Sequence, residues 1–122
     1  MDHEAEREAL LRLSLCRNVG PRVLFALTET FGSARGAEEA VRADSEDLEA
    51  LPSDARRGLK EGPPPGRVEE ELELMREHGV RLVPYFSEDY PPPLEELGPG
   101  RPPLLRMKGT YLERDRLAVA LV

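Results

Sequence analysis

Aromatic side chains are scarce in this chain of 122 residues: they make up 5% of it, and tryptophan is absent. A hydrophobic core must therefore be built from leucine, valine and alanine. Cysteine is limited to Cys16, which excludes an intrachain disulfide and a four-cysteine zinc site. Because Cys16 lies among leucines on an expected helix, we interpret it as a small core residue and not as a reactive thiol.

Long apolar runs are absent as well. The longest, residues 117–122, has six residues, whereas a helix that crosses a bilayer needs roughly 20. The acidic residues 1–6 contain no apolar segment of the kind found in a secretory signal. We therefore expect a cytoplasmic protein without a membrane partner.

Excess positive charge is also missing, since the net charge is −7. Binding to nucleic acids depends on the neutralisation of phosphates, and its usual mark is a basic face. The field of the whole chain would repel a polyanion, so we expect little DNA affinity in it.

Residue sets with the layout of an active site are absent too. The two histidines, His3 and His78, have no spacing typical of metal ligands, and the sequence contains neither GxGxxG nor a P-loop. We therefore predict no catalytic residue, no metal ion and no cofactor, and we classify the chain as not an enzyme.

The first half of the chain does have helical periodicity. Apolar residues recur at helical spacing over 4–16 and 21–31, Ser33 is suited to cap a third helix, and shorter helices are expected around Leu48 and Leu59. This pattern predicts a compact all-helical domain over residues 1–62.

The turn between the first two helices is the candidate DNA-binding site. Asn18 tolerates the left-handed backbone conformation and Gly20 adopts it freely. Helix-hairpin-helix modules have a glycine-rich turn here whose amide groups contact a DNA phosphate, and Arg17 and Arg22 would add positive charge. The turn has one glycine where that motif usually has two. The alternative, which the acidic surroundings favour, is that Asn18 and Gly20 only allow a tight reversal.

Residues 63–66, Pro-Pro-Pro-Gly, form a stiff spacer and the predicted domain boundary, followed by a second domain over 67–122. We expect a helix over 68–78 and then a strand over 80–85. Because Pro84 cannot donate to a ladder, that strand lies at a sheet edge or ends there.

Two further strands are expected over 104–109 and 117–122, joined by a polar connection. The uninterrupted apolar run 117–122 is typical of a strand buried on both faces of a parallel sheet. Ligands bind beyond the carboxyl ends of such strands, so we expect the front part of a longer protein, cut before its main binding site. The predicted fold class is α + α/β, with a helical domain followed by the first strands of an open sheet.

The order of several segments resembles the DprA/Smf family. In the first half the segments are Leu10-Leu11-Arg12-Leu13, Asn18-Val19-Gly20-Pro21 and Leu24, Leu27, Phe31-Gly32-Ser33. In the second half they are Glu77-His78-Gly79-Val80-Arg81-Leu82-Val83, Asp89-Tyr90-Pro91-Pro92-Pro93-Leu94, Pro102-Pro103-Leu104-Leu105, Lys108-Gly109 and Ala118-Val119-Ala120-Leu121-Val122. In the family these segments lead into a Gly-Ser-Arg motif that opens the nucleotide-fold domain. The resemblance covers residues 9–122.

The resemblance implies a DNA-processing protein of natural transformation, or competence. Such proteins bind incoming single-stranded DNA, protect it and help load the RecA recombinase for DNA recombination. They have a helical domain similar to sterile alpha motif (SAM) domains, an extended Rossmann-type domain that dimerises and holds DNA, and often a winged-helix-like domain. The principal DNA-binding residues follow the strand that ends at Val122, so none is carried onto this chain. The helical domain would serve a protein partner.

Two alternatives stay open. One is the front part of a Rossmann-type nucleotide-processing enzyme of the phosphoribohydrolase kind. The other is a freestanding helical protein-interaction module. The residues that follow Val122 in a longer protein would separate the first alternative from a DprA-like protein, since a Gly-Ser-Arg motif with basic positions favours DNA.

Overall fold

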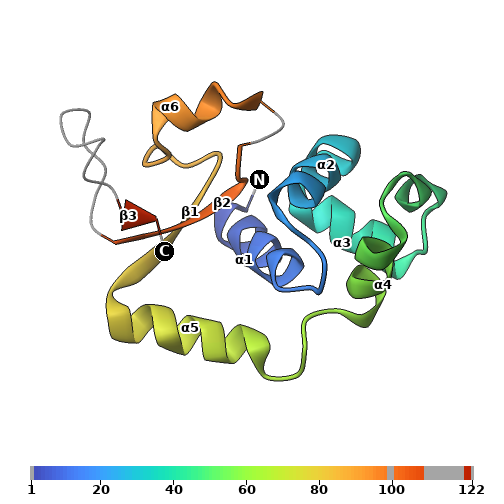
Figure 1. Cartoon of the computed structure of the whole chain (residues 1–122), viewed down its shortest axis with the longest axis horizontal. Coiled ribbons are helices and arrows are strands. Elements are labelled where there is room, and N and C mark those ends of the chain that lie inside the picture. The colour runs from blue at the N-terminus through green and yellow to red at the C-terminus, as the bar shows by residue number, and fades with distance from the viewer. Residues whose placement is uncertain (1, 99–100, 109–119, 122) are drawn as a thin grey trace.

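The computed structural model of the chain describes residues 2–98, 101–108 and 120–121 (Figure 1). The described part is mostly helical and has a small antiparallel sheet, which places it in the α plus β class. The helices are α1 (His3–Ser14), α2 (Pro21–Phe31), α3 (Ala34–Arg42), the 3-10 helix η1 (Glu46–Ala50), α4 (Ser53–Glu61), α5 (Arg67–His78) and α6 (Pro92–Glu95), and the strands are β1 (Val80–Pro84), β2 (Leu104–Lys108) and β3 (Ala120–Leu121).

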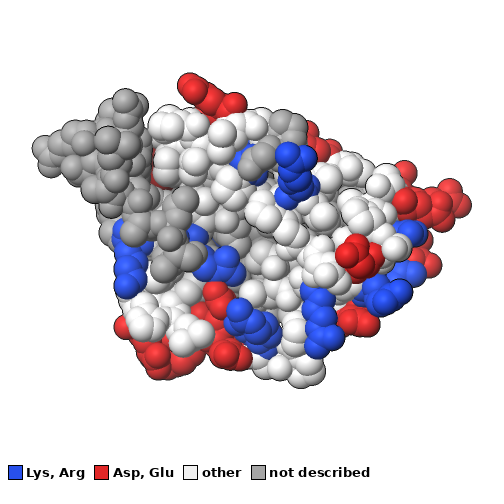
Figure 2. Space-filling view, viewed as in Figure 1, with Lys and Arg blue, Asp and Glu red and all other residues white. Residues whose placement is uncertain are grey.

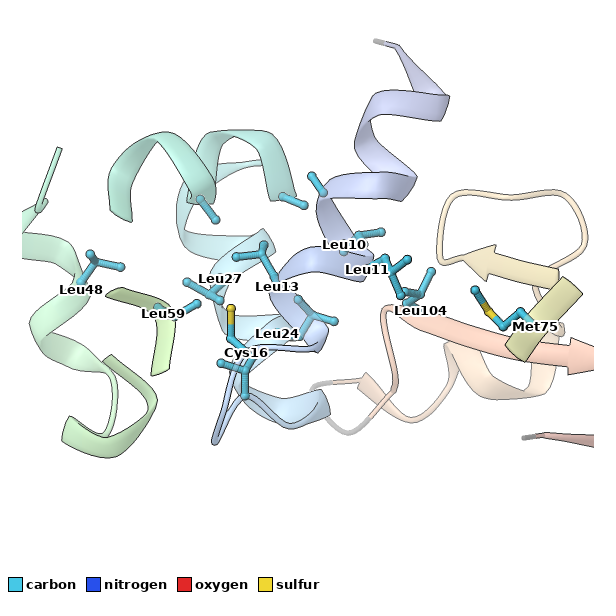
Figure 3. Close-up of a cluster of buried hydrophobic side chains, with 14 residues drawn as sticks. Leu10, Leu11, Leu13, Cys16, Leu24, Leu27, Leu48, Leu59, Met75 and Leu104 are labelled. Carbon is cyan, nitrogen blue, oxygen red and sulfur yellow. The ribbon is translucent and has the colours of Figure 1, made fainter. Parts of the chain in front are cut away.

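Helix α1 lies at the centre of the molecule, with α2 and α3 on one side and the strands β1 and β2 on the other (Figure 1). Its residues Leu10, Leu11 and Leu13 are buried in a cluster with Leu24 and Leu27 of α2 (Figure 3). Because Leu10 and Leu11 are neighbours in sequence, the apolar surface of α1 extends over more than one face of the helix. The helix can therefore be covered from two sides at once.

The predicted helices of the first half are confirmed. Helix α2 has the predicted bounds, α1 ends at Ser14 and not at residue 16, and the Ser33 hydroxyl accepts a hydrogen bond from the amide of Gly36 at the start of α3. Leu48 lies in η1 and Leu59 in α4, and both are buried.

Glu6 is a fully buried carboxylate on α1. Its two oxygens accept hydrogen bonds from the amide groups of Ala34 and Arg35, at 2.6 and 3.1 Å. These amides belong to the first turn of α3, where they have no partner within the helix and where the helix dipole favours negative charge. Glu6 therefore fixes the position of α3 on α1.

Removal of this carboxylate should destabilise the fold. For Glu6→Ala we expect the free energy of unfolding in urea to fall by about 2–4 kcal/mol, because the buried amide of Ala34 and the partly buried amide of Arg35 lose their acceptor. Glu8→Ala, at an exposed position of the same helix, is the matched control and should change it by less than about 0.5 kcal/mol. Equal losses in the two variants would contradict the role of Glu6.

The strands pair in antiparallel fashion, so the predicted parallel sheet is wrong for the described residues. In the order β1-β2-β3, Val83 of β1 lies opposite Leu105 of β2, and Met107 of β2 lies opposite Leu121 of β3. An apolar run indicates that a strand is covered on both faces, but it does not indicate the direction of the neighbouring strand. The prediction of strand direction from this pattern was therefore wrong. Of the predicted strand 117–122, the structure describes only β3, and Gly109 of the predicted strand 104–109 lies outside the described residues.

Both faces of the β1–β2 pair are covered. Val80, Leu82 and Leu104 pack with the α1 cluster on one face, while Val83 and Leu105 pack with other residues on the opposite face. The second cluster is completed by Met107, Tyr90 and, partly buried, Leu94 of α6. Because both faces are covered, consecutive residues of β2 are buried, as they would be in a parallel sheet between layers of helices.

Residues 63–66 lie between α4 and α5, as the proline-rich spacer predicts. One hydrophobic cluster nevertheless includes residues from both sides of it, since Leu10 and Leu59 share it with Met75 of α5 and Leu104 of β2 (Figure 3). The division into domains 1–62 and 67–122 stays a prediction.

Glu71 links α5 to the sheet. Its oxygens accept hydrogen bonds from Arg67 of the same helix, at 2.8 Å, and from Arg106 of β2, at 2.6 Å. Burial disfavours the charged carboxylate, but the two guanidinium groups together outweigh it and hold the pKa of Glu71 below its usual value. The ion cluster thus stabilises the packing of α5 on β2.

This cluster should make stability depend on pH. A carboxyl group whose pKa is lowered by folding stabilises the fold fully above its unfolded pKa, about 4.3 for glutamate, and this contribution is lost as the pH falls through the folded pKa. We expect Glu71→Gln to lower the free energy of unfolding by about 1–3 kcal/mol at neutral pH. The difference from the wild type should shrink below pH ~4.3.

Urea denaturation of both proteins over a pH series measures this effect. Glu73→Gln is the matched control, since Glu73 lies on the same helix in an exposed ion pair with Arg76. A difference for Glu71→Gln that does not vary with pH would contradict the role of the charge.

Candidate functional site

The hairpin between α1 and α2 is the candidate site, and its predicted backbone is half right. Asn18 has a φ of 65°, in the left-handed region that asparagine tolerates. Gly20 has a φ of −87° and serves as the N-cap of α2, so its expected left-handed conformation is wrong. Asn18 alone makes the reversal, and a β-carbon on Gly20 would meet no atom within 4 Å.

The start of α2 offers donors for an anion. Gly20 provides no side-chain cap, and Pro21 has no amide hydrogen, so the amides of Arg22 and Val23 remain at the open end of the helix. Arg17 and Arg22 are both exposed on this hairpin, and neither makes an ion pair within the part of the chain that the structure describes. Together these groups could contact one phosphate.

Helix α4 packs closely against the backbone of the hairpin. A β-carbon on Gly58 would lie 1.8 Å from the carbonyl oxygen of Arg17, so only glycine allows this approach. The helical spacing of α4 places Arg57 towards the hairpin side, together with Asp54 and Glu61. The neighbouring charge is therefore mixed, and α4 does not extend the positive surface of the hairpin.

Carboxylates already neutralise several other arginines of the described residues. Arg12 donates two hydrogen bonds of 2.8 Å to Glu38, and Arg81 donates one of 2.7 Å to Asp89. Figure 2 shows basic and acidic side chains interspersed over the visible face of the molecule. The hairpin thus has room for a single phosphate contact and not for a basic track along a nucleic-acid strand.

Cys16 is 7% exposed, and its thiol lies 3.4 Å from the carbonyl oxygen of Arg12. Burial, and secondarily the charge of Glu38, raises the pKa of the Cys16 thiol to about 11. The thiolate, which is the reactive form, is disfavoured at neutral pH. This environment agrees with the interpretation of Cys16 as a core residue.

The two histidines lie in different surroundings. His3 stacks on Phe86 with ring centroids 4.8 Å apart, and His78 ends α5 at an exposed position. Among the described residues, no group of three or more histidine, cysteine, aspartate or glutamate side chains is placed to hold a metal ion.

Arg101 is a residue that the sequence pattern did not indicate. Its guanidinium carbon lies 5.5 Å from the ring centroid of Phe25 on α2 and 6.0 Å from that of Tyr85, which follows β1. It therefore bridges the helical part and the strand part of the molecule through cation–π contacts. No spacing along the chain could have indicated this contact, because the three residues are far apart in sequence.

Comparison of the sequence with models of known protein families and with curated proteins finds no match. The helices within the described residues are all too short or too polar to cross a membrane.

Proposed function

We propose that this chain is the N-terminal portion of a DprA/Smf-like recombination mediator, a cytoplasmic protein of natural transformation that binds single-stranded DNA and helps load RecA. Residues 1–62 form its SAM-like helical domain, which serves a protein partner, and the later residues begin its Rossmann-type domain. The role is not enzymatic and needs no cofactor. The full-length protein is a homodimer.

One observation supports this proposal: the segments that carry the resemblance contact one another. Arg81 pairs with Asp89, and the Tyr90 hydroxyl donates a hydrogen bond of 2.8 Å to the carbonyl oxygen of Pro102. Val83 and Leu105, which belong to the same segments as Arg81 and Pro102, lie opposite each other and share a core with Tyr90. The residues that resemble the family therefore contact one another in one part of the structure, which a chance likeness of separate segments would not require.

Val83, Tyr90 and Leu105 build a core and do not form a polar site. The proposal therefore gives this part of the protein a supporting role and assigns the principal DNA contacts to residues that follow the 117–122 segment in family members. The hairpin, with Arg17 and Arg22, adds at most one phosphate contact.

Deletion of the encoding gene in a naturally competent host tests the proposal. We expect the frequency of transformation by chromosomal DNA to fall, while uptake of labelled DNA into the cell stays unchanged. An intact copy of the gene should restore transformation. An unchanged frequency would overturn the proposal, and a loss of uptake would point to a transport function instead.

Fluorescence anisotropy with a labelled single-stranded oligonucleotide measures the share of this chain in DNA binding. At near-physiological salt we expect binding weaker than about 1 μM, because the chain is acidic overall. At low salt, Arg17→Ala with Arg22→Ala should weaken the residual binding more than Arg35→Ala with Arg42→Ala, which removes two exposed arginines of α3. Submicromolar binding at physiological salt, or equal effects of the two double variants, would contradict these assignments.

A further inference from the structure

The outward face of α4 carries a group of basic side chains. The helix lies at the side of the molecule away from the sheet (Figure 1), and its inner face consists of the buried residues Ala55, Gly58 and Leu59. Because an α-helix has about 3.6 residues per turn, most of its other residues lie on the opposite, outward face. A cavity of about 310 Å³ lies on that face, and its lining consists of Ser53, Arg56, Arg57, Lys60 and Glu61. We call the surface formed by these residues the α4 basic face.

Two of the three cations on the α4 basic face have no anionic partner. Within the part of the chain that the structure describes, Arg56 and Arg57 make no ion pair. The Nε atom of Arg56 is buried, and it has no hydrogen-bond acceptor among the described residues. Lys60 pairs with Asp44 at 3.2 Å, but the two side chains are 60% and 74% exposed, so water screens this pair. An external anion can therefore bind all three cations.

Carboxylates border the α4 basic face on both sides. Glu61 belongs to its lining, and Asp54 lies beside Glu61 in the helical spacing, towards the hairpin. On the other side, Asp44 and Arg42 line the neighbouring cavity together with Lys60. The acidic residues of η1, which packs on α4, lie outside the lining. The lining itself has three cations against one carboxylate, so it attracts an anion, but the positive surface is only one helix wide.

The borders and the composition of the α4 basic face favour a protein segment over a nucleic-acid strand. A single strand binds through a basic groove that follows its backbone and through aromatic side chains on which its bases stack. The lining has no aromatic side chain, and a strand that extends beyond it would meet Asp54 or Asp44. A short peptide segment needs no stacking, and all its carboxylates can lie within the length of α4.

The spacing of the cations suits acidic residues at alternate positions of an extended segment. Arg56 and Lys60 are four residues apart on α4, which corresponds to about 6 Å along the helix axis. Alternate side chains of an extended chain point to the same side and are about 7 Å apart. Two carboxylates at such positions can therefore each meet one turn of the helix, and a guanidinium group can donate two hydrogen bonds to one carboxylate.

We propose that the α4 basic face binds an extended acidic segment of a partner protein. Arg56 and Arg57 bind one carboxylate of this segment, and Lys60 binds the next acidic residue on the same side. Because exposed ion pairs are individually weak, the complex dissociates readily and weakens as salt is added. The inference rests on the protein partner that the proposed function gives the helical domain, and it adds where and by which chemistry that partner binds.

Two synthetic peptides test the charge requirement. The first has three glutamates at alternate positions, separated by serines, and the second has glutamine in place of each glutamate. In an NMR titration of the isotope-labelled chain we expect the first peptide to shift the amide signals of α4 and the second to leave them in place. No shift at α4 with the first peptide, or equal shifts with both, would overturn the proposal.

Paired variants of the protein locate the site. Arg57→Gln with Lys60→Gln changes only exposed side chains, and we expect it to weaken binding of the first peptide about 3- to 10-fold, as suits two exposed ion pairs. The matched control, Arg22→Gln with Arg35→Gln, removes two exposed arginines outside the α4 basic face and should weaken it less. Equal weakening would mean that the peptide responds only to net charge, and the proposal would be wrong.

A third variant keeps the test valid if the first pair does not fold. Glu61→Gln removes the exposed carboxylate of the lining, so we expect it to strengthen binding of the first peptide about 2-fold. Unchanged or weaker binding would contradict the assignment to the α4 basic face.

An oligonucleotide of about 20 thymidines separates the two classes of ligand. We expect it to shift the α4 signals less than the first peptide at equal concentration and near-physiological salt. Equal or larger shifts would make nucleic acid the ligand and overturn the proposal. The gene deletion described above tests the proposed function separately. A transformation defect without peptide binding would overturn only this inference, and peptide binding without a defect would overturn only the role in DNA processing.

Discussion

Helix α1 has to be buried on two sides at once, and the rest of the structure depends on this constraint. Leu10 and Leu11 are 0% and 1% exposed although they point in different directions from the helix. The helices α2 and α3 supply one cover and the strands β1 and β2 the other. Neither cover would suffice alone, because a half-covered α1 would expose a row of leucines to water.

Polar contacts then fix the relative positions of helices and strands that apolar packing alone does not determine. Glu6 sets α3 on α1, Glu71 sets α5 on β2, and Arg101 lies between α2 and the segment after β1. Each contact joins elements that are distant in sequence, and two of them use a carboxylate held by several donors. Such buried charged groups are costly unless they are fully bonded, so they favour one arrangement of the elements over others of similar apolar burial.

The sequence was informative where a local pattern decides the outcome and uninformative where distant segments meet. Helix α2 and the cap by Ser33 follow from spacing and side-chain chemistry, and the end of β1 follows from Pro84. Strand direction did not follow, because the apolar run of residues 117–122 reports only burial. Glu6 could have been noticed, since it precedes Leu10 and Leu13 by four and seven residues on the buried face of α1. At the candidate hairpin, the left-handed conformation of Asn18 was predictable, but the close approach of α4 was not.

This close approach has an evolutionary consequence. Gly58 carries no motif, lies inside a helix where glycine is a poor choice, and yet excludes even a methyl group because the Arg17 carbonyl fills its place. Homologous proteins that share this arrangement should therefore keep glycine at position 58, while the hairpin residues around Gly20 can be substituted. Where another residue does replace glycine there, the loop and α4 must have moved apart, and the change would mark a lineage in which the two helices meet differently.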